Sequence, residues 1–292
     1  MTNETIELIR PEQLHTINSA IYGTLKVGFT SGERLNVLQS FDHAHEKGGK
    51  LQTLGHALVT RVAFYADVKK HPQKYDTPQK QKAGLDKTDE YQRTSTVNLK
   101  FKNDGSFDVD APYLCASVDL EGNTDYRKLV QAGYDANRAG NELIIPIKDA
   151  SISKLIARAR ESGRVAPTLL ENQLKLATAQ TEGKSVYGQD RRVIALFGSA
   201  ELAELNASYL SERGYKTGYV WDLTTKDLEK MLRDKEDHTF VRSVGLGGGG
   251  YYDVDYIDAN DEFVGWARPV VHVGAQKSFI RNEGSVKSAS NP

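Results

Sequence analysis

Residues 95–120 read STVNLKFKNDGSFDVDAPYLCASVDL, and this stretch decides the fold class. Val97 and Leu99 alternate with polar residues, which is the period of a half-buried strand. Asp104 and Gly105 follow, and the alternation then resumes. An Asp-Gly pair between two alternating runs predicts a β-hairpin, because its turn needs positive φ angles that both residues tolerate. Because helical patterns flank this hairpin, the expected fold class is α+β.

The amino-terminal side of the hairpin has a helical period from Ile6 to about Asp67. Apolar residues recur there at steps of three and four, and Gly48-Gly49 separates two of the segments. We therefore expect a helical amino-terminal segment of three helices. Residues 68–92 are rich in Lys, Gln and Pro, and this composition, too polar to bury, predicts a loop.

The carboxyl-terminal side of the hairpin alternates helices and strands. Thr124 offers an N-cap to a helix that Gly133 would end. Residues 143–147 predict a buried strand, and the amphipathic helix after it ends at Gly163. These elements complete a first domain, residues 1–165.

A second unit begins at Arg191. Residues 193–197 predict a hydrophobic strand, Ser199 caps a helix that ends at Gly214, and residues 215–221 predict another strand. Thr224 and Asp227 then have the spacing of a capping box and predict the start of a further helix. This order indicates an α/β unit. The expected organisation is an α+β domain (1–165), a connector (166–190), an α/β unit (191–281) and a disordered tail (282–292).

Composition excludes several classes of protein. The 38 Lys and Arg against 39 Asp and Glu give a net charge of −1, which offers no global attraction for nucleic acid or anionic membranes. The single cysteine, Cys115, forms no disulfide within the chain and excludes Cys-rich zinc modules. The opening residues MTNETIELIR lack the regions of a signal peptide, and no apolar run reaches the roughly 20 residues of a membrane span. We expect a cytoplasmic or virion-associated protein without a membrane partner.

One possible cofactor site lies in the predicted β-α-β run, residues 193–222. A strand would enter a turn at Gly198-Ser199, where a helix amino terminus favours phosphate, and Asp222 would follow the next strand where a ribose-binding acid lies. The dinucleotide fingerprint needs three glycines, of which only Gly198 is present. A nucleotide-dependent enzyme with a Rossmann-like unit is therefore an alternative, and a plain packed unit is the favoured interpretation.

Three further clusters favour a structural interpretation over a chemical one. The glycine run 245–250 lacks the Lys and Ser or Thr of a P-loop, and the acidic string 253–262 lacks the spacing of an EF-hand. His43 and His45 are two residues apart on a predicted helix and point to different faces, so they share no metal ion. Cys115 is interpreted as a small core residue. We assign no metal and no catalytic residue, so an enzyme is the less favoured class, and the sequence leaves the identity of any cofactor open.

The segment 61–102 is basic, with ten Lys or Arg against five acids. This charge and the rings of Tyr75 and Tyr91 suit a polyanion and base stacking. Nucleic-acid binding through residues 61–102 is therefore a second alternative. A solvated loop is the favoured interpretation.

The carboxyl end resembles a known family. Arg242-Ser243 on a predicted strand, a Gly- and Asp-rich loop, and a closing Gly-Trp-Ala-Arg-Pro segment at 265–269 resemble the end of C-type-lectin-like domains of the formylglycine-generating (sulfatase-modifying-factor) type. The resemblance implies that Arg242, Ser243 and Arg268 tie irregular loops to the core. The enzymes of that family use a cysteine pair, which this chain lacks, so their activity is not implied.

The resemblance implies a ligand surface in the exposed loop between these motifs, as in phage-associated binding proteins. A loop rich in Gly, Tyr and Asp, residues 245–262, has the adaptable chemistry of binding surfaces. We expect a non-catalytic binding or structural protein, of phage or prophage type, with a protein or glycan ligand. The sequence does not decide its oligomeric state. The expected ligand-binding residues are Gly247, Gly248, Tyr251, Tyr252, Asp253, Asp255 and Trp266.

Overall fold

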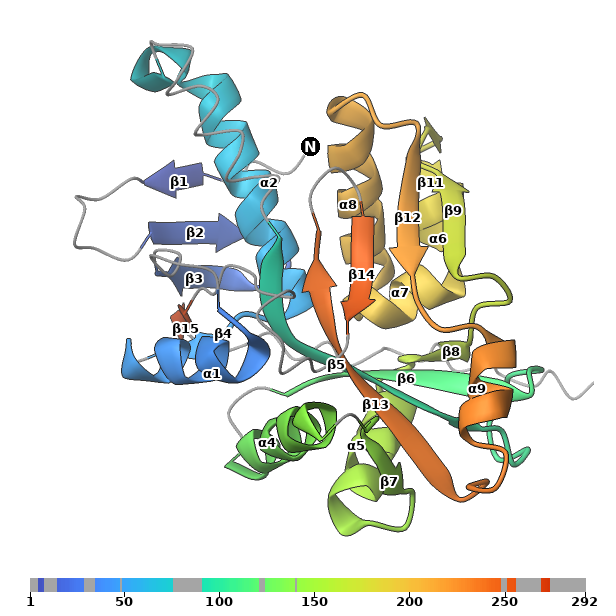
Figure 1. The fold of residues 1–292 in the computed structure, drawn as a ribbon. Helices are drawn as coiled ribbons and strands as arrows, with labels where there is room; N and C mark the ends of the chain where they lie inside the picture. Colours follow the sequence, from blue (N-terminus) through green and yellow to red (C-terminus); the bar gives the residue numbers. More distant parts are fainter. Residues whose placement is uncertain are drawn as a thin grey trace, which may run out of the picture.

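The chain folds as a mixed α+β protein in which helices surround two main β-sheets (Figure 1). The computed structural model describes residues 5–7, 15–28, 35–47, 49–75, 91–120, 124–139, 141–247, 251–255 and 269–273. The predicted α+β class is confirmed. The predicted tail, residues 282–292, lies outside the described residues.

The larger sheet has eight strands in the order β8-β6-β5-β13-β14-β12-β9, and β7 also pairs with β13. Neighbouring strands are antiparallel, except that β12 and β14 are parallel. The strands are β5 (Gln92–Lys102), β6 (Tyr113–Asp119), β7 (Ile144–Pro146), β8 (Val165–Pro167), β9 (Gln173–Ala177), β12 (Thr217–Trp221), β13 (His238–Leu246) and β14 (Tyr251–Asp255). Because β5 pairs with β13, this sheet includes strands from both predicted domains, whose boundaries stay a prediction.

The predicted hairpin pairs as expected but has a longer connection. Strands β5 and β6 are antiparallel, with Leu99 opposite Ala116. The second strand begins at Tyr113, and residues 103–112 form the connection instead of a tight turn. The side chain of Asn103 explains this, because its amide donates to backbone carbonyls within the connection and holds it as a compact loop.

Two groups of helices cover the two faces of the larger sheet. Helices α4 (Thr124–Arg138) and α5 (Ala150–Glu161) pack on the apolar face that includes Val97 and Leu99. Strands β12 and β13 pack their other face against helices α2 (Leu54–Lys70), α6 (Val186–Gln189), α7 (Arg191–Phe197) and α8 (Ala200–Glu212). Helix α4 runs past Gly133, where the sequence predicted its end, to Arg138.

The amino-terminal segment forms strands where three helices were expected, so this prediction is wrong in part. Among the residues of this segment that the structure describes, only α1 (Val37–Glu46) and α2 are helical. Leu25 and Val27 are buried while Lys26 between them is exposed, which is the period of a strand, and Gly23 turns the chain at φ +72°. The second sheet has the order β1-β2-β3-β15-β4, with β1 (Thr5–Glu7), β2 (His15–Ser19), β3 (Gly23–Val27), β4 (Lys50–Leu51) and β15 (Pro269–Val273).

The run 193–197, predicted as a strand, is helix α7. Asp190 caps this helix by accepting a hydrogen bond from the backbone of Arg192, and Val193, Leu196 and Phe197 are buried at helical spacing. The unit is therefore α-α-β, and the Rossmann-like β-α-β geometry proposed for 193–222 is wrong.

Other local predictions are confirmed. Ser199 caps α8, and Thr224 with Asp227 forms a capping box at helix α9 (Thr225–Met231). Strands β7 and β12 lie within the predicted segments 143–147 and 215–221. Short elements complete the described chain: β10 (Gln180–Thr181), β11 (Lys184–Ser185) and the 3-10 helix η1 (Pro72–Tyr75).

Candidate functional site

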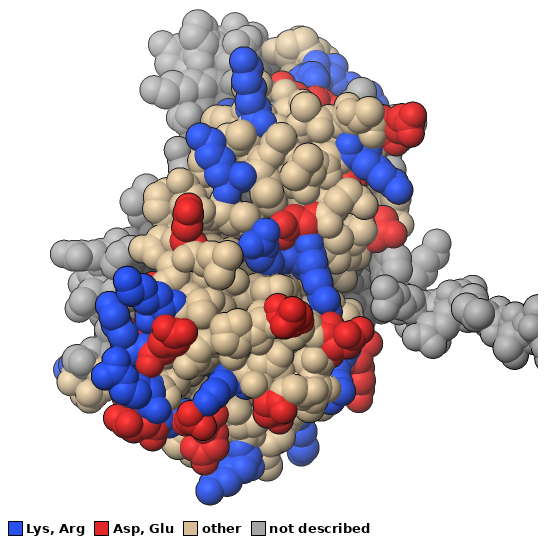
Figure 2. Space-filling model, turned by 90° about the vertical axis from the view of Figure 1, so that its right-hand side faces the viewer, with Lys and Arg blue, Asp and Glu red and all other residues tan. Residues whose placement is uncertain are grey.

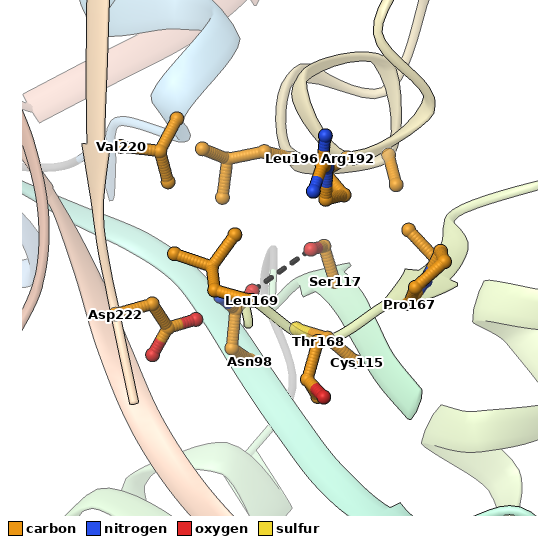
Figure 3. Close-up of a pocket in the computed structure, with 12 residues that line it drawn as sticks. Asn98, Cys115, Ser117, Pro167, Thr168, Leu169, Arg192, Leu196, Val220 and Asp222 are labelled. Carbon is orange, nitrogen blue, oxygen red and sulfur yellow. Dashed lines mark hydrogen bonds between the residues drawn. The ribbon is translucent and has the colours of Figure 1, made fainter. Parts of the chain in front are cut away.

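A small pocket lies between α7 and the strands β5, β6, β8 and β12 (Figure 3). Its volume is about 30 Å³, room for one or two water molecules. Its polar walls come from Asn98, Ser117, Thr168, Arg192 and Asp222, and the rest is formed by Cys115, Ala166, Pro167, Leu169, Ala195, Leu196 and Val220. A space of this size does not hold a nucleotide.

Asp222, which lines the pocket, belongs to a buried ion pair. Lys100 is fully buried on β5, and its Nζ lies 2.8 Å from Oδ1 of Asp222, which follows β12. Only 8% of the Asp222 side chain is exposed. The carboxylate that was expected to bind a ribose is therefore occupied by a lysine of the same chain.

The other reactive groups of the pocket are also engaged. Burial raises the pKa of the Cys115 thiol to about 12, which keeps it protonated at neutral pH. Ser117 donates a hydrogen bond of 2.8 Å to Asn98 Oδ1 (Figure 3). Arg192 forms an ion pair of 2.6 Å with Asp190. Cys115 and Ser117 are therefore not activated as nucleophiles in this arrangement.

Arg164 anchors the α7 wall of the pocket. Its guanidinium donates to the carbonyls of Ala195 (3.0 Å) and Leu196 (2.9 Å), and pairs with the carboxylate of Asp119 at 2.5 Å. Burial acts to raise the pKa of Asp119, but the Arg164 charge and hydrogen bonds from Arg164 and Thr96 outweigh it and hold that pKa below its usual value. The site is thus fixed by internal charge pairs.

A second candidate site is the outer face of the larger sheet, opposite α6, α7 and α8. We define it by Lys175 on β9, Tyr219 and Trp221 on β12, and register positions 251 and 253 on β14. Figure 1 shows the three helices behind these strands, and no helix of the described residues in front of them. Trp221 is 38% exposed, and the Lys175 ammonium lies 5.4 Å from the centroid of the Tyr219 ring.

 

Strand register places two predicted ligand residues on this outer face. Asp253 on β14 is opposite Trp221 on one side and Gly245 on the other, and Tyr251 is opposite Tyr219. Residues opposite each other on neighbouring strands share a face of the sheet. Positions 251 and 253 therefore belong to the outer face.

Position 252 belongs to the opposite face. Its register partners are Val220 and Leu246, which are both buried in the core under the helices. The prediction that residues 251–255 form a loop is wrong, because they form a strand hydrogen-bonded on both sides. Their alternation of large and acidic residues, YYDVD, has the period of a strand.

The remaining predicted ligand and motif residues have mixed outcomes. Gly247 is described and buried, and its carbonyl accepts a hydrogen bond of 2.6 Å from Arg61, which also donates to the carbonyl of Leu246 at 3.1 Å. Arg242 and Ser243 lie on β13 and are buried. Asp255 lies on β14, opposite Ser243. Gly248, Trp266 and Arg268 lie outside the described residues.

The residues of the nucleotide alternative do not form one pocket. Gly198, at φ +92°, ends α7 and lies beside the Arg164 guanidinium, and Ser199 begins α8. Asp222 lines the small pocket, whose walls include neither Gly198 nor Ser199. The turn joins two helices, so it lacks the strand that a nucleotide-binding turn requires.

Three of the ten basic residues in the segment 61–102 are buried in the protein. Arg61, Arg93 and Lys100 are buried, so they cannot reach a phosphate backbone. The guanidinium carbon of Arg93 lies 5.3 Å from the centroid of the Tyr91 ring. The hydroxyl of Tyr91 lies over Gly245. Figure 2 shows Lys and Arg interspersed with Asp and Glu on the side of the molecule that it presents.

Comparisons with known proteins give little guidance. No family model and no curated protein matches the chain. A solved structure described as "Accommodation of massive sequence variation in Nanoarchaeota by the C-type lectin fold" aligns with 84% of this chain and 96% of that chain, at 10% identity and a TM-score of 0.39. A TM-score this low carries no argument about this chain.

The described residues offer neither a metal site nor a membrane-spanning helix. In that part of the chain, no three His, Cys, Asp or Glu side chains gather in a way that suits a metal ion. None of its helices is long and apolar enough to cross a membrane. The outer face and the small pocket are therefore the two candidate sites.

Proposed function

We propose that the chain is a non-catalytic binding protein whose ligand surface is the outer face around Trp221. The exposure of Trp221 carries this proposal, because a large aromatic side chain left open to solvent at the end of β12 is typical of a recognition surface. Tyr219 and Lys175 lie beside it, and register adds Tyr251 and Asp253.

A glycan is the ligand that this chemistry fits best. Aromatic faces stack on the apolar side of a sugar ring, while carboxylate, ammonium and phenol groups hydrogen-bond its hydroxyls. Hydrogen bonds from Thr217 and Lys175 lower the pKa of Tyr219, so its oxygen is already polarised as an acceptor. The C-type-lectin-like assignment and the phage or prophage-type role belong to the same proposal and rest on the Arg242-Ser243 resemblance.

The test is a printed glycan array probed with the labelled full chain, followed by titration of each hit. We expect Trp221→Ala and Tyr251→Ala to weaken binding at least tenfold while the urea midpoint stays unchanged. Val186→Ala is the matched control, because Val186 is 61% exposed but lies on α6, away from the outer face. Tyr252→Ala should instead lower the urea midpoint, because its register partners belong to the core.

Two results would contradict the proposal. One is an array without a hit for the wild-type chain. The other is a hit that Trp221→Ala binds as tightly as the wild type. Trp266→Phe leaves Trp221 as the single tryptophan, so quenching of its fluorescence by a hit reports directly on the proposed surface.

A further inference from the structure

Lys100 and Asp222 form an unusual pair in the interior. Lys100 is fully buried, and its Nζ lies 2.8 Å from the carboxylate. No acceptor among the described residues, including this carboxylate, meets hydrogen-bond geometry at Nζ. A buried ion pair without good hydrogen bonds does not recover the cost of removing two charges from water. The pair is therefore close but poorly satisfied as a salt bridge.

We propose that Lys100 and Asp222 are a site of self-modification, at which the two side chains condense to an intramolecular isopeptide bond. A bond forms between Lys100 Nζ and Asp222 Cγ, and one Cγ–O bond breaks. Two ammonium protons leave with one carboxylate oxygen as water, and the third proton stays on the amide nitrogen. The step is redox-neutral and needs no co-reactant.

Three features of the site favour this step over a persistent ion pair. The fold holds the two reacting groups in contact, which replaces a bimolecular reaction by a unimolecular one. Burial keeps bulk water away from the amide once it has formed. The adjacent pocket, which Asp222 lines, has room for the water molecule that is released.

The bond would join parts of the sheet that are distant in sequence. Lys100 lies on β5 and Asp222 follows β12, and β13 and β14 separate these strands in the sheet. A covalent link between residues so far apart in the sequence reduces the conformational entropy of the unfolded chain. It thereby stabilises the folded state, as a disulfide that closes a long loop does. The chain has only one cysteine, so such a link does not depend on a disulfide.

The decisive measurement is the intact mass of the denatured full-length protein. We expect the wild type to be lighter than its sequence by one water molecule. Lys100→Arg and Asp222→Asn should each have their full sequence mass, and Lys100→Arg keeps the positive charge as a matched control. Tryptic mapping of the wild type should give a branched peptide that joins the segments around Lys100 and Asp222, with no cleavage after Lys100.

The wild-type chain alone decides the outcome, so a variant that fails to fold does not affect it. A wild-type mass equal to the sequence mass, with trypsin cleaving after Lys100, overturns the proposal and leaves an ion pair. A water loss that maps to Asp104-Gly105, where a succinimide forms readily, also overturns it. This measurement is independent of glycan binding, so either proposal can fail without the other.

Discussion

Gly218 shows how one residue supports the sheet under the outer face. It lies on β12, and a Cβ built there would meet the ring of Tyr187 at 2.4 Å and Leu210 at 3.0 Å. Gly218→Ala should therefore lower the free energy of unfolding by about 3 kcal/mol, the upper range for overpacking a core. Urea denaturation of the two proteins measures the difference.

A double-mutant cycle separates this clash from a general effect of the substitution. In a Tyr187→Leu background the ring is absent, so adding Gly218→Ala should cost much less than in the wild type. An equal cost in both backgrounds would show that the Tyr187 ring is not what Gly218 accommodates.

Asp119 should make stability depend on pH in the acid range. Its folded pKa is lowered, so it stabilises the fold above its unfolded pKa of about 4, and this stabilisation is lost as the pH falls through the folded value. Wild-type urea midpoints should therefore fall on acidification, and Asp119→Asn should be less stable near neutral pH with a smaller fall. Parallel slopes for the two proteins would assign the acid sensitivity to other carboxylates.

Residue-scale prediction worked where the signal is local. The caps at Ser199 and Thr224 follow from residues within one helical turn. The Lys100–Asp222 pair was not predicted, because its partners meet only through the sheet and a lysine in an alternating strand normally faces solvent. Nothing in the spacing of either residue indicates the other.

At the scale of elements, Glu204 on α8 joins this helix to the segment containing β10, β11 and α6. Its carboxylate accepts hydrogen bonds from the backbone and hydroxyl of Ser185, from Gln189 and from Gln180. Burial acts to raise the pKa of Glu204, but these donors outweigh it and lower that pKa, so the group is charged at neutral pH.

Glu204→Ala should leave these donors without an acceptor and cost about 1–3 kcal/mol. Hydrogen exchange should become faster for amides 180–189, while amides of β5 and β6 keep their protection. Glu201→Ala is the matched control, because Glu201 is exposed on the same helix. Equal effects of the two substitutions would contradict the role of Glu204 as a tether.

Element identity was predictable where length and caps agree with period, as for α5 and α9. For short apolar runs the predicted type of element was wrong. Residues 193–197 have the composition of a buried strand, and their helical state depends on the Asp190 cap and on burial against α2 and α8. The amino-terminal strands were missed because β3 pairs with β15, a partner almost the whole chain away.

At the scale of the whole molecule, neither sheet could be predicted as a unit. The larger sheet joins β5 to β13, and the smaller one places β15 between β3 and β4. The period of a segment indicates that it is a strand, but pairing between distant segments depends on three-dimensional packing that a single sequence does not display. Two positions of the proposed outer face, 251 and 253, are among the residues expected from the sequence to bind a ligand, and that role stays a prediction. Trp221 and Tyr219 were recognised only through register.

The closure of the smaller sheet by β15 gives a prediction for the molecule as a whole. Residues 270–273 of β15 pair with β3, and residues 269 and 270 pair with β4. Strand β15 is therefore the common partner of β3 and β4. Ending the chain after residue 268 would leave the edges of β3 and β4 unpaired and remove part of the packing over α1. We expect a lower Tm and faster hydrogen exchange in β2 and β3, with the amides of β5 and β6 less affected. Ending the chain after residue 281 removes only the predicted tail and should change neither the Tm nor the exchange rates. If both truncations lowered the Tm equally, the tail and not β15 would stabilise this end of the protein.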